Sequence, residues 1–404
     1  MKHEDLVVKS RSYLESLCQE IGERAVGSQG NRKATRFFKD LISSFGWVTE
    51  STEFGAMDWQ EGGASLQVGR ENFNVLVSPY SLGCSVHQRL VSASSVAELG
   101  ELDVAGKILL LHGEIAKEQL MPKNFVFYNP EEHQRIIALL EEKAPVAIVT
   151  ATGRNPELAG GVYPFPLFED GDFDIPSVYM TEEEGQRLLA YTGETVKLAS
   201  ISRRVPAKGY NVLARKGGGS GKRIVITAHI DAKKGTPGAI DNASGVVVLL
   251  LLAELFKDYD GEQMLELVAL NGEDYYAASG QMLYLQQNQD RFGEILLNIN
   301  IDGAGYFQGE SAFSFFNLPD ELMVKARATL EKFDGIAEGV PWYQGDHSIF
   351  LQNGCPAMAV TSQWFLENIA NQEITHTPKD NLEIVEPGKL VEIAEALKFF
   401  ILSC

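Results

Sequence analysis

Five short segments of the chain carry side chains that can bind metal ions or move protons. In the open α/β sheets of proteins, ligands bind at the C-terminal ends of strands, and these segments lie at expected strand ends or in loops. Each alone has an ordinary explanation: a strand-end histidine is usually structural, and Asn242 or Ser244 is a suitable helix cap. Together they hold two His, three Asp and one Glu in an order that suits a two-zinc hydrolase. The segments are 228–231 with His229, 239–245 with Asp241, 271–274 with Glu273 and Asp274, 300–303 with Asp302, and 375–380 with His376.

The spacing within two of these segments predicts a division of roles. His229 can bind a metal through one ring nitrogen while Asp231, two residues further on, orients the ring. Glu273 and Asp274 are adjacent in a loop, so their side chains point in different directions. One of the two carboxylates can then bind a metal while the other transfers protons.

The elements that position these segments are predicted from runs of apolar residues. Four runs lack polar alternation, as expected for parallel strands covered on both faces, and the segments between them have helical spacing. Alternating strands and helices indicate an α/β fold, a three-layer α/β/α sandwich with a mostly parallel mixed sheet. The expected strands are 223–229, 264–270, 295–301 and 357–361; the expected helices are 31–45, 246–257, 281–287 and one from Leu390 to Ile401.

The stretch from 58 to 205 has a different rhythm and predicts a separate β-rich inserted domain. It contains expected strands at 107–111 and 146–150, an amphipathic helix over 131–143, and a capping box that begins at Thr181. We therefore expect a catalytic domain built from residues 1–57 and 206–404, with residues 58–205 inserted into it.

Composition excludes several classes of protein. The 404 residues include 35 Lys and Arg against 55 Asp and Glu, a net charge of −20, so binding to nucleic acids or anionic membranes is not expected. The longest uncharged apolar run is too short for a membrane span, and no signal peptide is evident. Four scattered cysteines indicate neither a disulfide framework nor a thiolate metal site. We expect a cytoplasmic protein that binds peptides, with homo-oligomer formation left open.

The motifs as a set resemble the co-catalytic, two-zinc aminopeptidases, a metallopeptidase family that also includes the glutamate carboxypeptidases and, more distantly, the glutaminyl cyclases. The inserted domain resembles a protease-associated domain, through Gly106-Lys-Ile-Leu-Leu-Leu111 and Ala144-Pro-Val-Ala-Ile-Val149. The motifs that carry the family resemblance are Ala-His229-Ile-Asp231, Asp241-Asn-Ala-Ser-Gly245, Glu273-Asp274, Asn-Ile-Asp302, Gly345-Asp346-His347 and His376-Thr-Pro-Lys-Asp380.

The resemblance implies a role for each site residue. Asp241 would bridge two zinc ions; His229 and Asp302 would complete one site, and Asp274 and His376 the other. Cobalt or manganese are possible substitutes for zinc, because sites of His and carboxylate accept several metals. Two further residues complete the implied machinery, with Glu273 as general base and Asp231 as the group that orients His229.

Two positions depart from the family pattern. The family usually has Glu-Glu where this chain has Glu273-Asp274, and the shorter aspartate predicts a shifted or weaker second metal. The residue before the last histidine is commonly an aromatic that stabilises the oxyanion, whereas here it is Thr375. Tyr343, Tyr306 or His347 are alternatives for that role, while Asp346 and His347 are expected to shape the pocket.

The resemblance implies a zinc-dependent metallo-aminopeptidase that hydrolyses the N-terminal peptide bond of peptides. A carboxypeptidase or dipeptidase on the same scaffold is the alternative among hydrolases, although no isolated basic residue in the motifs identifies a carboxylate clamp. A glutaminyl cyclase is less consistent with the sequence, because Asp302 supplies a ligand for a second metal. A non-catalytic binding or scaffold protein is the alternative outside the enzymes.

Overall fold

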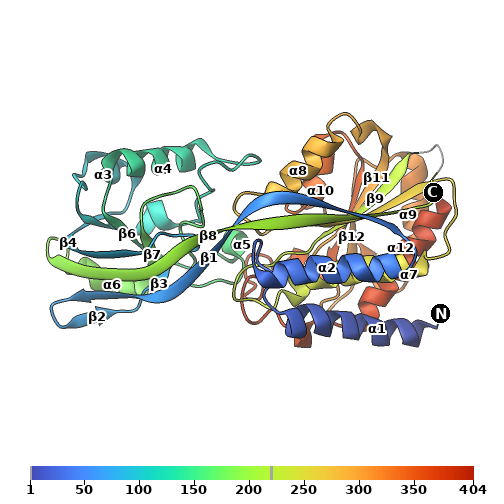
Figure 1. Cartoon of the computed structure of the whole chain (residues 1–404), viewed down its shortest axis with the longest axis horizontal. Helices are drawn as coiled ribbons and strands as arrows, with labels where there is room; N and C mark the ends of the chain where they lie inside the picture. Colours follow the sequence, from blue (N-terminus) through green and yellow to red (C-terminus); the bar gives the residue numbers. More distant parts are fainter. Residues whose placement is uncertain (1, 219–221) are drawn as a thin grey trace. The chain divides into compact units, whose positions relative to one another are not determined.

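The computed structural model describes residues 2–218 and 222–404, which form two compact units (Figure 1). One unit combines Met1–Ala56 with Lys208–Cys404, and the other is the continuous stretch Met57–Ala207. The part of the chain that the structure describes contains no helix that is both long enough and apolar enough to cross a membrane.

The sheet of the first unit has β9 at its centre, and every residue of this strand is buried. β9 pairs in parallel with β10 and β11, and β11 pairs in parallel with β14. β8 and β12 run antiparallel to their neighbours β10 and β14, so the sheet is mixed but mostly parallel at its centre. In spatial order the strands are β13 (Ile336–Glu338), β12 (Ser311–Phe316), β14 (Ala357–Ser362), β11 (Ile295–Ile301), β9 (Arg223–His229), β10 (Met264–Leu270) and β8 (Thr195–Lys216).

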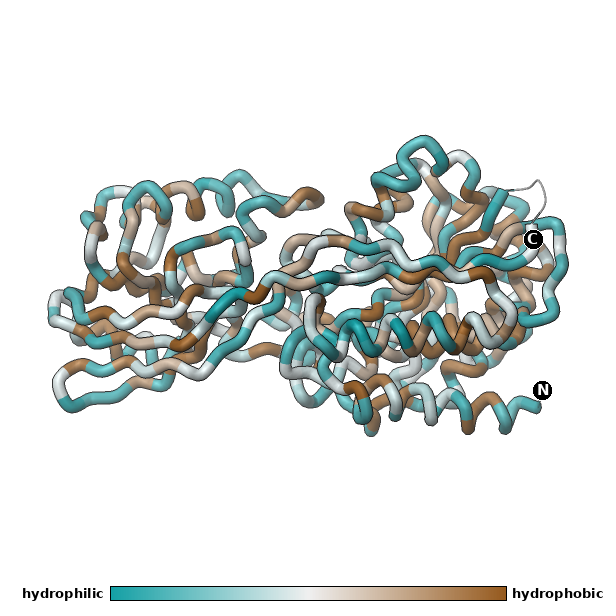
Figure 2. Tube along the Cα trace, in the orientation of Figure 1, coloured by the Kyte–Doolittle hydropathy of each residue, from teal (hydrophilic) through white to brown (hydrophobic). Residues whose placement is uncertain are grey.

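Helices cover both faces of this sheet, as Figure 1 shows, which confirms the three-layer α/β/α architecture. On one face, α7 (Ser244–Leu255) is apolar all round, because it packs on β9 and is itself covered by α1, α2 and α12. The tube of α2 alternates between brown and teal in Figure 2, as expected for a helix with one buried and one exposed face. The other helices of this face are α1 (His3–Glu15), α2 (Gln29–Ser44) and α12 (Pro387–Ser403); α8 (Ser279–Asn288) and α10 (His347–Gln352) lie on the opposite face.

The remaining elements of the first unit are short except for α9, which packs on α12. They are η1 (Ser16–Ile21), η3 (Ala239–Ala243), η4 (Phe292–Glu294), α9 (Asp320–Leu330), α11 (Gln363–Asn368) and η5 (Leu382–Ile384). The expected strands 223–229, 264–270 and 295–301 are confirmed at both ends. The sequence did not indicate α1 or the antiparallel strand β12.

The second unit has its own apolar interior, built around a parallel run of four strands. The expected helix over 131–143 is α4, and the Thr181 side chain caps α6 by accepting a hydrogen bond from the Glu184 N–H. The similarity of this unit to a protease-associated domain stays a prediction. Its elements are β1 (Val48–Val68, shared with the first unit, as is β8), β2 (Glu71–Phe73), β3 (Leu76–Val77), β4 (Cys84–Ala93), α3 (Val96–Glu101), β5 (Ile108–Leu111), η2 (Gly113–Ala116), α4 (Glu131–Lys143), β6 (Ala147–Thr152), α5 (Pro156–Ala159), β7 (Ser177–Thr181) and α6 (Glu182–Leu189).

Candidate metal centre

Five side chains with metal-binding chemistry meet at one edge of the sheet in the first unit. The edge is the one where the parallel strands β9, β10 and β11 end, so residues distant in sequence come together there. His229 is the last residue of β9, Asp241 lies in η3, Asp274 follows β10, Asp302 follows β11, and His376 lies in the loop between α11 and η5.

The carboxylate of Asp241 lies between the two histidines. Its Oδ1 is 3.1 Å from Nε2 of His229, and its Oδ2 is 3.2 Å from Nε2 of His376. Each histidine also faces one further carboxylate: His229 Nε2 is 3.6 Å from Asp302 Oδ1, and His376 Nε2 is 3.1 Å from Asp274 Oδ1. The arrangement therefore consists of two three-residue groups that share Asp241.

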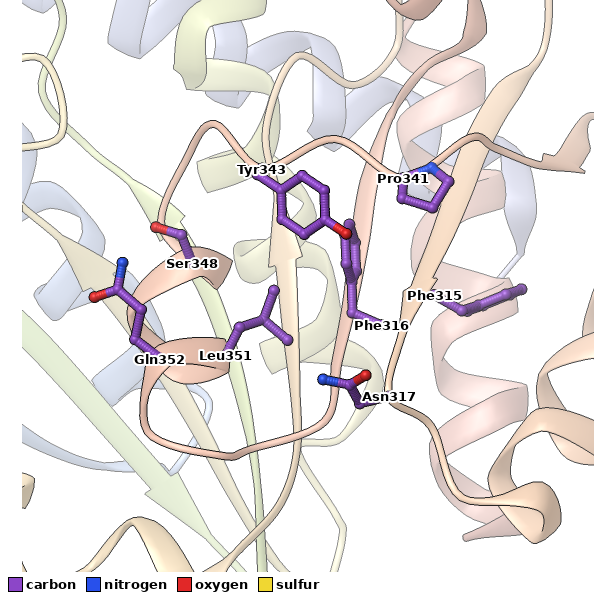
Figure 3. Close-up of a pocket in the computed structure, with 8 residues that line it drawn as sticks. All are labelled: Phe315, Phe316, Asn317, Pro341, Tyr343, Ser348, Leu351 and Gln352. Carbon is purple, nitrogen blue, oxygen red and sulfur yellow. The ribbon is translucent and has the colours of Figure 1, made fainter. Parts of the chain in front are cut away.

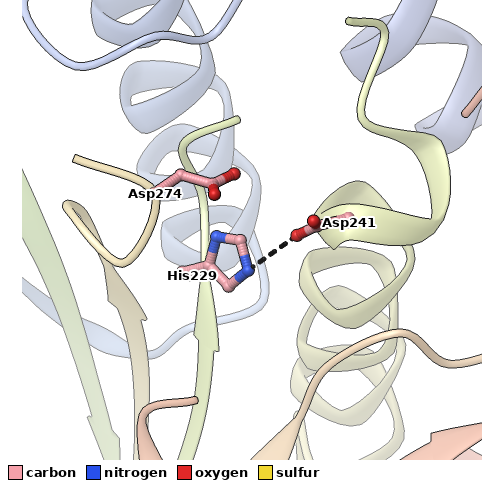
Figure 4. A group of neighbouring side chains, drawn as sticks. All are labelled: His229, Asp241 and Asp274. Carbon is pink, nitrogen blue, oxygen red and sulfur yellow. Dashed lines mark ion pairs between the residues drawn. The ribbon is translucent and has the colours of Figure 1, made fainter. Parts of the chain in front are cut away.

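These distances are compatible with ligand atoms that share a metal ion. A tetrahedral zinc ion with bonds of about 2.0–2.1 Å holds its ligand atoms about 3.3 Å apart, which is close to the four distances of 3.1–3.6 Å. Neither ring nitrogen of His229 has a hydrogen-bond partner among the described residues, although both are buried. Asp274 Oδ2 is buried and unpartnered in the same way. Figure 4 shows His229, Asp241 and Asp274, whose ligand atoms all lie within 4.8 Å of one another.

The electrostatics of this cluster favour cations. Burial acts to lower the pKa of His229, but the carboxylates of Asp302, Asp231 and Asp241 outweigh it and raise the pKa well above its ordinary value. For His376 the opposing effects are again burial and carboxylates, and Asp274 and Asp241 raise its pKa. A site that stabilises positive charge on both imidazoles also suits divalent cations.

Glu273 lies beside these groups on the loop after β10. Burial, together with the negative charges of Asp274, Asp302 and Asp346, raises the pKa of the Glu273 carboxyl well above its ordinary value, against an opposing effect of His229. Asp231 holds the backbone on both sides of Glu273: it accepts hydrogen bonds from the Gly272 N–H at 2.7 Å and from the Asp274 N–H at 3.0 Å.

Asp231 is also a neighbour of His229, with Oδ1 3.7 Å from Nδ1. That separation is longer than a hydrogen bond, so the predicted orientation of the His229 ring by Asp231 stays a prediction. What the structure adds is the contact with the loop that carries Glu273, because the two backbone amides use both carboxylate oxygens of Asp231.

The segment that carries Asp241 is held from the side of β11. Asn242 is fully buried; its Nδ2 donates to the Ile301 carbonyl at 2.8 Å, and its Oδ1 accepts from the Gly245 N–H at 3.0 Å. A side chain at Gly245 would place its Cβ 2.5 Å from both the Ile301 carbonyl and Asn242 Oδ1. Glycine at this position therefore allows the start of α7 to approach the end of β11, next to Asp302.

The residues expected to shape the pocket are buried beside the centre. The Asp346 carboxylate accepts a hydrogen bond from Gln281, and burial raises its pKa to about 7. His347 Nε2 is 2.8 Å from the Trp342 carbonyl, and the His347 ring also contacts the Trp342 and Phe316 rings.

The alternatives for the oxyanion group lie in different surroundings. Tyr306 is packed against Trp364 and is 6% exposed, whereas Tyr343 is 68% exposed and its ring contacts Phe316. The hydroxyl of Thr375 accepts a hydrogen bond from the side chain of Gln372 at 2.7 Å. Thr375 therefore helps to fix the loop that carries His376.

A cavity of about 440 Å³ lies beside α10 and does not include the candidate metal ligands. Figure 3 shows Tyr343, Phe316 and Leu351 around it, with Ser348 and Gln352 supplying polar groups. Its lining contains neither a carboxylate nor an imidazole, so this cavity is not a candidate metal site.

Buried polar residues hold the site loops from behind, and sequence reasoning missed most of their contacts. Asn31, from α2, and Asn271, just before the Glu273 loop, form a reciprocal pair of amide hydrogen bonds of 2.8 and 2.9 Å. The Asp380 carboxylate accepts from the Ile240 and Asp241 N–H groups at 2.6 and 3.1 Å. Burial, followed by the charge of Asp241, raises the pKa of Asp380 to about 7. The position of Asp380 in the His376 motif is the one signal that pointed to this region.

An α/β/α sandwich with paired His and Asp groups at the strand ends offers the kind of ligands that metal-dependent hydrolases use. The comparisons agree: residues 211–401 match peptidase family M28. The match covers 191 of the 404 residues and agrees with the resemblance of the motifs to metallopeptidases.

Two curated proteins that are similar in sequence to this chain are named as aminopeptidases. The chain is 25% identical over 304 residues to the probable lipoprotein aminopeptidase LpqL of Mycobacterium tuberculosis, a match that covers 71% of this chain but 57% of the relative. It is 22% identical to the aminopeptidase YwaD of Bacillus subtilis, over 95% of this chain and 82% of the relative. The expected cytoplasmic location stays a prediction.

Solved structures share the fold. An aminopeptidase from Aneurinibacillus sp. strain AM-1 superposes with a TM-score of 0.74 at 20% identity, covering 98% of this chain and 93% of the other. BSAP, a zinc aminopeptidase from Bacillus subtilis, superposes with a TM-score of 0.74 at 17% identity, covering 98% and 94%. At these identities, the comparisons with structures establish the architecture alone.

Proposed function

We propose that the chain is a zinc-dependent aminopeptidase that removes the N-terminal residue from peptides. The observation that carries the proposal is the position of Asp241, whose two carboxylate oxygens each face the Nε2 of a different histidine. Each histidine has a further carboxylate of its own, so the chain offers ligands for two ions. The aminopeptidase names of the relatives favour the N-terminal bond as the one that is cleaved.

The proposed mechanism assigns His229, Asp302 and Asp241 to one zinc ion, and His376, Asp274 and Asp241 to the other. Zinc at these positions supplies Lewis acidity, which polarises a carbonyl and lowers the pKa of water. Glu273 accepts the proton of the attacking water and later delivers it to the nitrogen of the leaving amine. Asp231 supports this transfer, because it fixes the backbone amides on both sides of Glu273.

The proposal is tested with a pool of peptides, half of them N-acetylated, incubated with zinc-loaded protein and with a chelated control. Mass spectrometry should show stepwise loss of residues from free N-termini only, and chelation should abolish it. Loss of residues from the C-termini of acetylated peptides would instead identify a carboxypeptidase. Zinc binding without any cleavage would favour a scaffold protein and contradict the proposal.

Two variants separate the proposed chemistry from effects on folding. Glu273→Gln removes the proton acceptor with little change in shape, and we expect kcat to fall by a factor of about 10²–10⁴. Glu262→Gln makes the same change on the exposed turn before β10 and should keep full activity. Full turnover by Glu273→Gln would show that Glu273 is not the general base.

A further inference from the structure

A fully buried arginine, Arg24, contacts the backbone of the loop between His229 and Asp241. Its guanidinium donates hydrogen bonds to four carbonyl oxygens: Ile230 at 3.1 Å, Leu17 at 3.2 Å, and Pro237 and Gly238 at 2.7 Å each. Four of the five N–H donors of the guanidinium therefore point at backbone.

The positions of these carbonyls relate Arg24 to the candidate ligands. Ile230 directly follows His229, and Gly238 lies three residues before Asp241. One rigid, planar group thus holds both ends of the 230–238 loop, which lies between His229 and Asp241 in the chain.

Asp380 contacts the residues just after this loop and accepts from their backbone N–H groups, whereas Arg24 donates to backbone carbonyls. Its carboxylate accepts from the Ile240 and Asp241 N–H groups, and its backbone carbonyl accepts from the Ala239 N–H at 3.3 Å. Thr236 Oγ1 donates to the Thr377 carbonyl at 2.9 Å, which ties the loop to the residue after His376. The segment from Ile230 to Asp241 is therefore held by the Arg24 guanidinium on its carbonyls and by the buried Asp380 carboxyl group on its amides.

We propose that Arg24 is a positioning residue of the metal centre, which sets the separation of His229 and Asp241 through the 230–238 loop. Arg24 lies outside residues 211–401, the part of the chain that matches the peptidase family. The inference rests on the proposed function in one respect, since it presumes that Asp241 and His229 share an ion.

The test compares two buried arginines changed to lysine. Lysine keeps the charge but replaces the planar fork with a compact ammonium that cannot span from Ile230 to Gly238. Arg223 is the matched control: it is 3% exposed, begins the strand that His229 ends, and donates to Asn288. Zinc affinity is measured by competition with a chromogenic chelator, the melting temperature in chelator, and the visible spectrum of the cobalt-loaded protein.

We expect Arg24→Lys to lower zinc affinity about ten- to a hundredfold and to alter the cobalt spectrum, as changes around metal ligands do. Arg223→Lys should lower the melting temperature but leave zinc affinity and the spectrum unchanged. Wild-type affinity in Arg24→Lys, or an equal loss of affinity in both variants, would overturn the proposal. Absence of zinc binding by the wild-type chain would instead refute the proposed function, and the positioning role with it.

A second variant covers the case in which Arg24→Lys does not fold. Asp380→Asn keeps the shape of the side chain but places an amide donor against the Ile240 and Asp241 N–H groups. It should lower zinc affinity over the same range if the loop sets the position of Asp241. Unchanged affinity in a folded Asp380→Asn variant would contradict a role for this loop.

Discussion

Asp274 stands where the family that the motifs resemble has glutamate, and lengthening it tests whether the site is built for the shorter side chain. Asp274 Oδ1 already lies 3.1 Å from His376 Nε2, close to the edge of a zinc tetrahedron. Its side chain is 4% exposed, so an extra methylene of about 1.5 Å has no path into solvent. Asp274→Glu must therefore displace either the carboxylate or the packing around it.

The cost follows from overpacking in a buried site, typically about 1–3 kcal/mol. If that strain appears in binding, the zinc Kd of the His376 site rises about 5- to 150-fold. Calorimetric titration of the metal-free protein should show one weakened and one unchanged class of sites. Asp302→Glu is the comparison: its side chain is 17% exposed, so we expect a smaller loss, and for the other ion.

Equal or tighter zinc binding by Asp274→Glu would refute this reasoning. That result would mean that aspartate binds zinc no better than glutamate at this position, as its shorter length alone suggested. It would also mean that the loop after β10 can move to accommodate glutamate. Retained binding of both ions with lost turnover would point instead to displacement of the neighbouring Glu273.

Three further predictions follow from the geometry. Gly245→Ala should cost about 1–3 kcal/mol of stability and lower Tm in calorimetry, because its Cβ would lie 2.5 Å from Ile301 O and Asn242 Oδ1; an unchanged Tm would contradict the close approach. Burial lowers the pKa of His347 below its ordinary 6.5, so the contribution of the neutral ring to stability should be complete above about pH 6.5 and lost as the pH falls toward the lowered pKa. NMR titration of the ring should show the lowered pKa, and a pKa above 6.5 would contradict this prediction. Chelation should lower Tm, because ligands that bind only the folded state stabilise it; equal Tm with and without zinc would count against a built site.

The sequence predicted the strands that carry the site because their physical signal is local. β9, β10 and β11 are mostly apolar runs buried on both faces, and His229, Asp274 and Asp302 lie at their ends or within four residues of them. The contacts of Asn31 and Arg24 with the site loops leave no such signal: each is one polar residue whose partners in those loops lie more than 200 residues away. The strand β12 was also not predicted. Its antiparallel direction follows from its pairing with β14, which a single sequence does not reveal.

The division of the chain into one discontinuous and one continuous unit has a consequence for synthesis. Met57–Ala207 is complete once the ribosome has passed it and can fold while the chain is still being made. The other unit needs segments from both sides of this stretch, since α12 packs on α1 and α7. Of the five candidate metal ligands, His376 is the last along the chain and follows Asp302 by 74 residues. The complete set of candidate ligands is therefore expected only once the segment that carries His376 has been made and has docked.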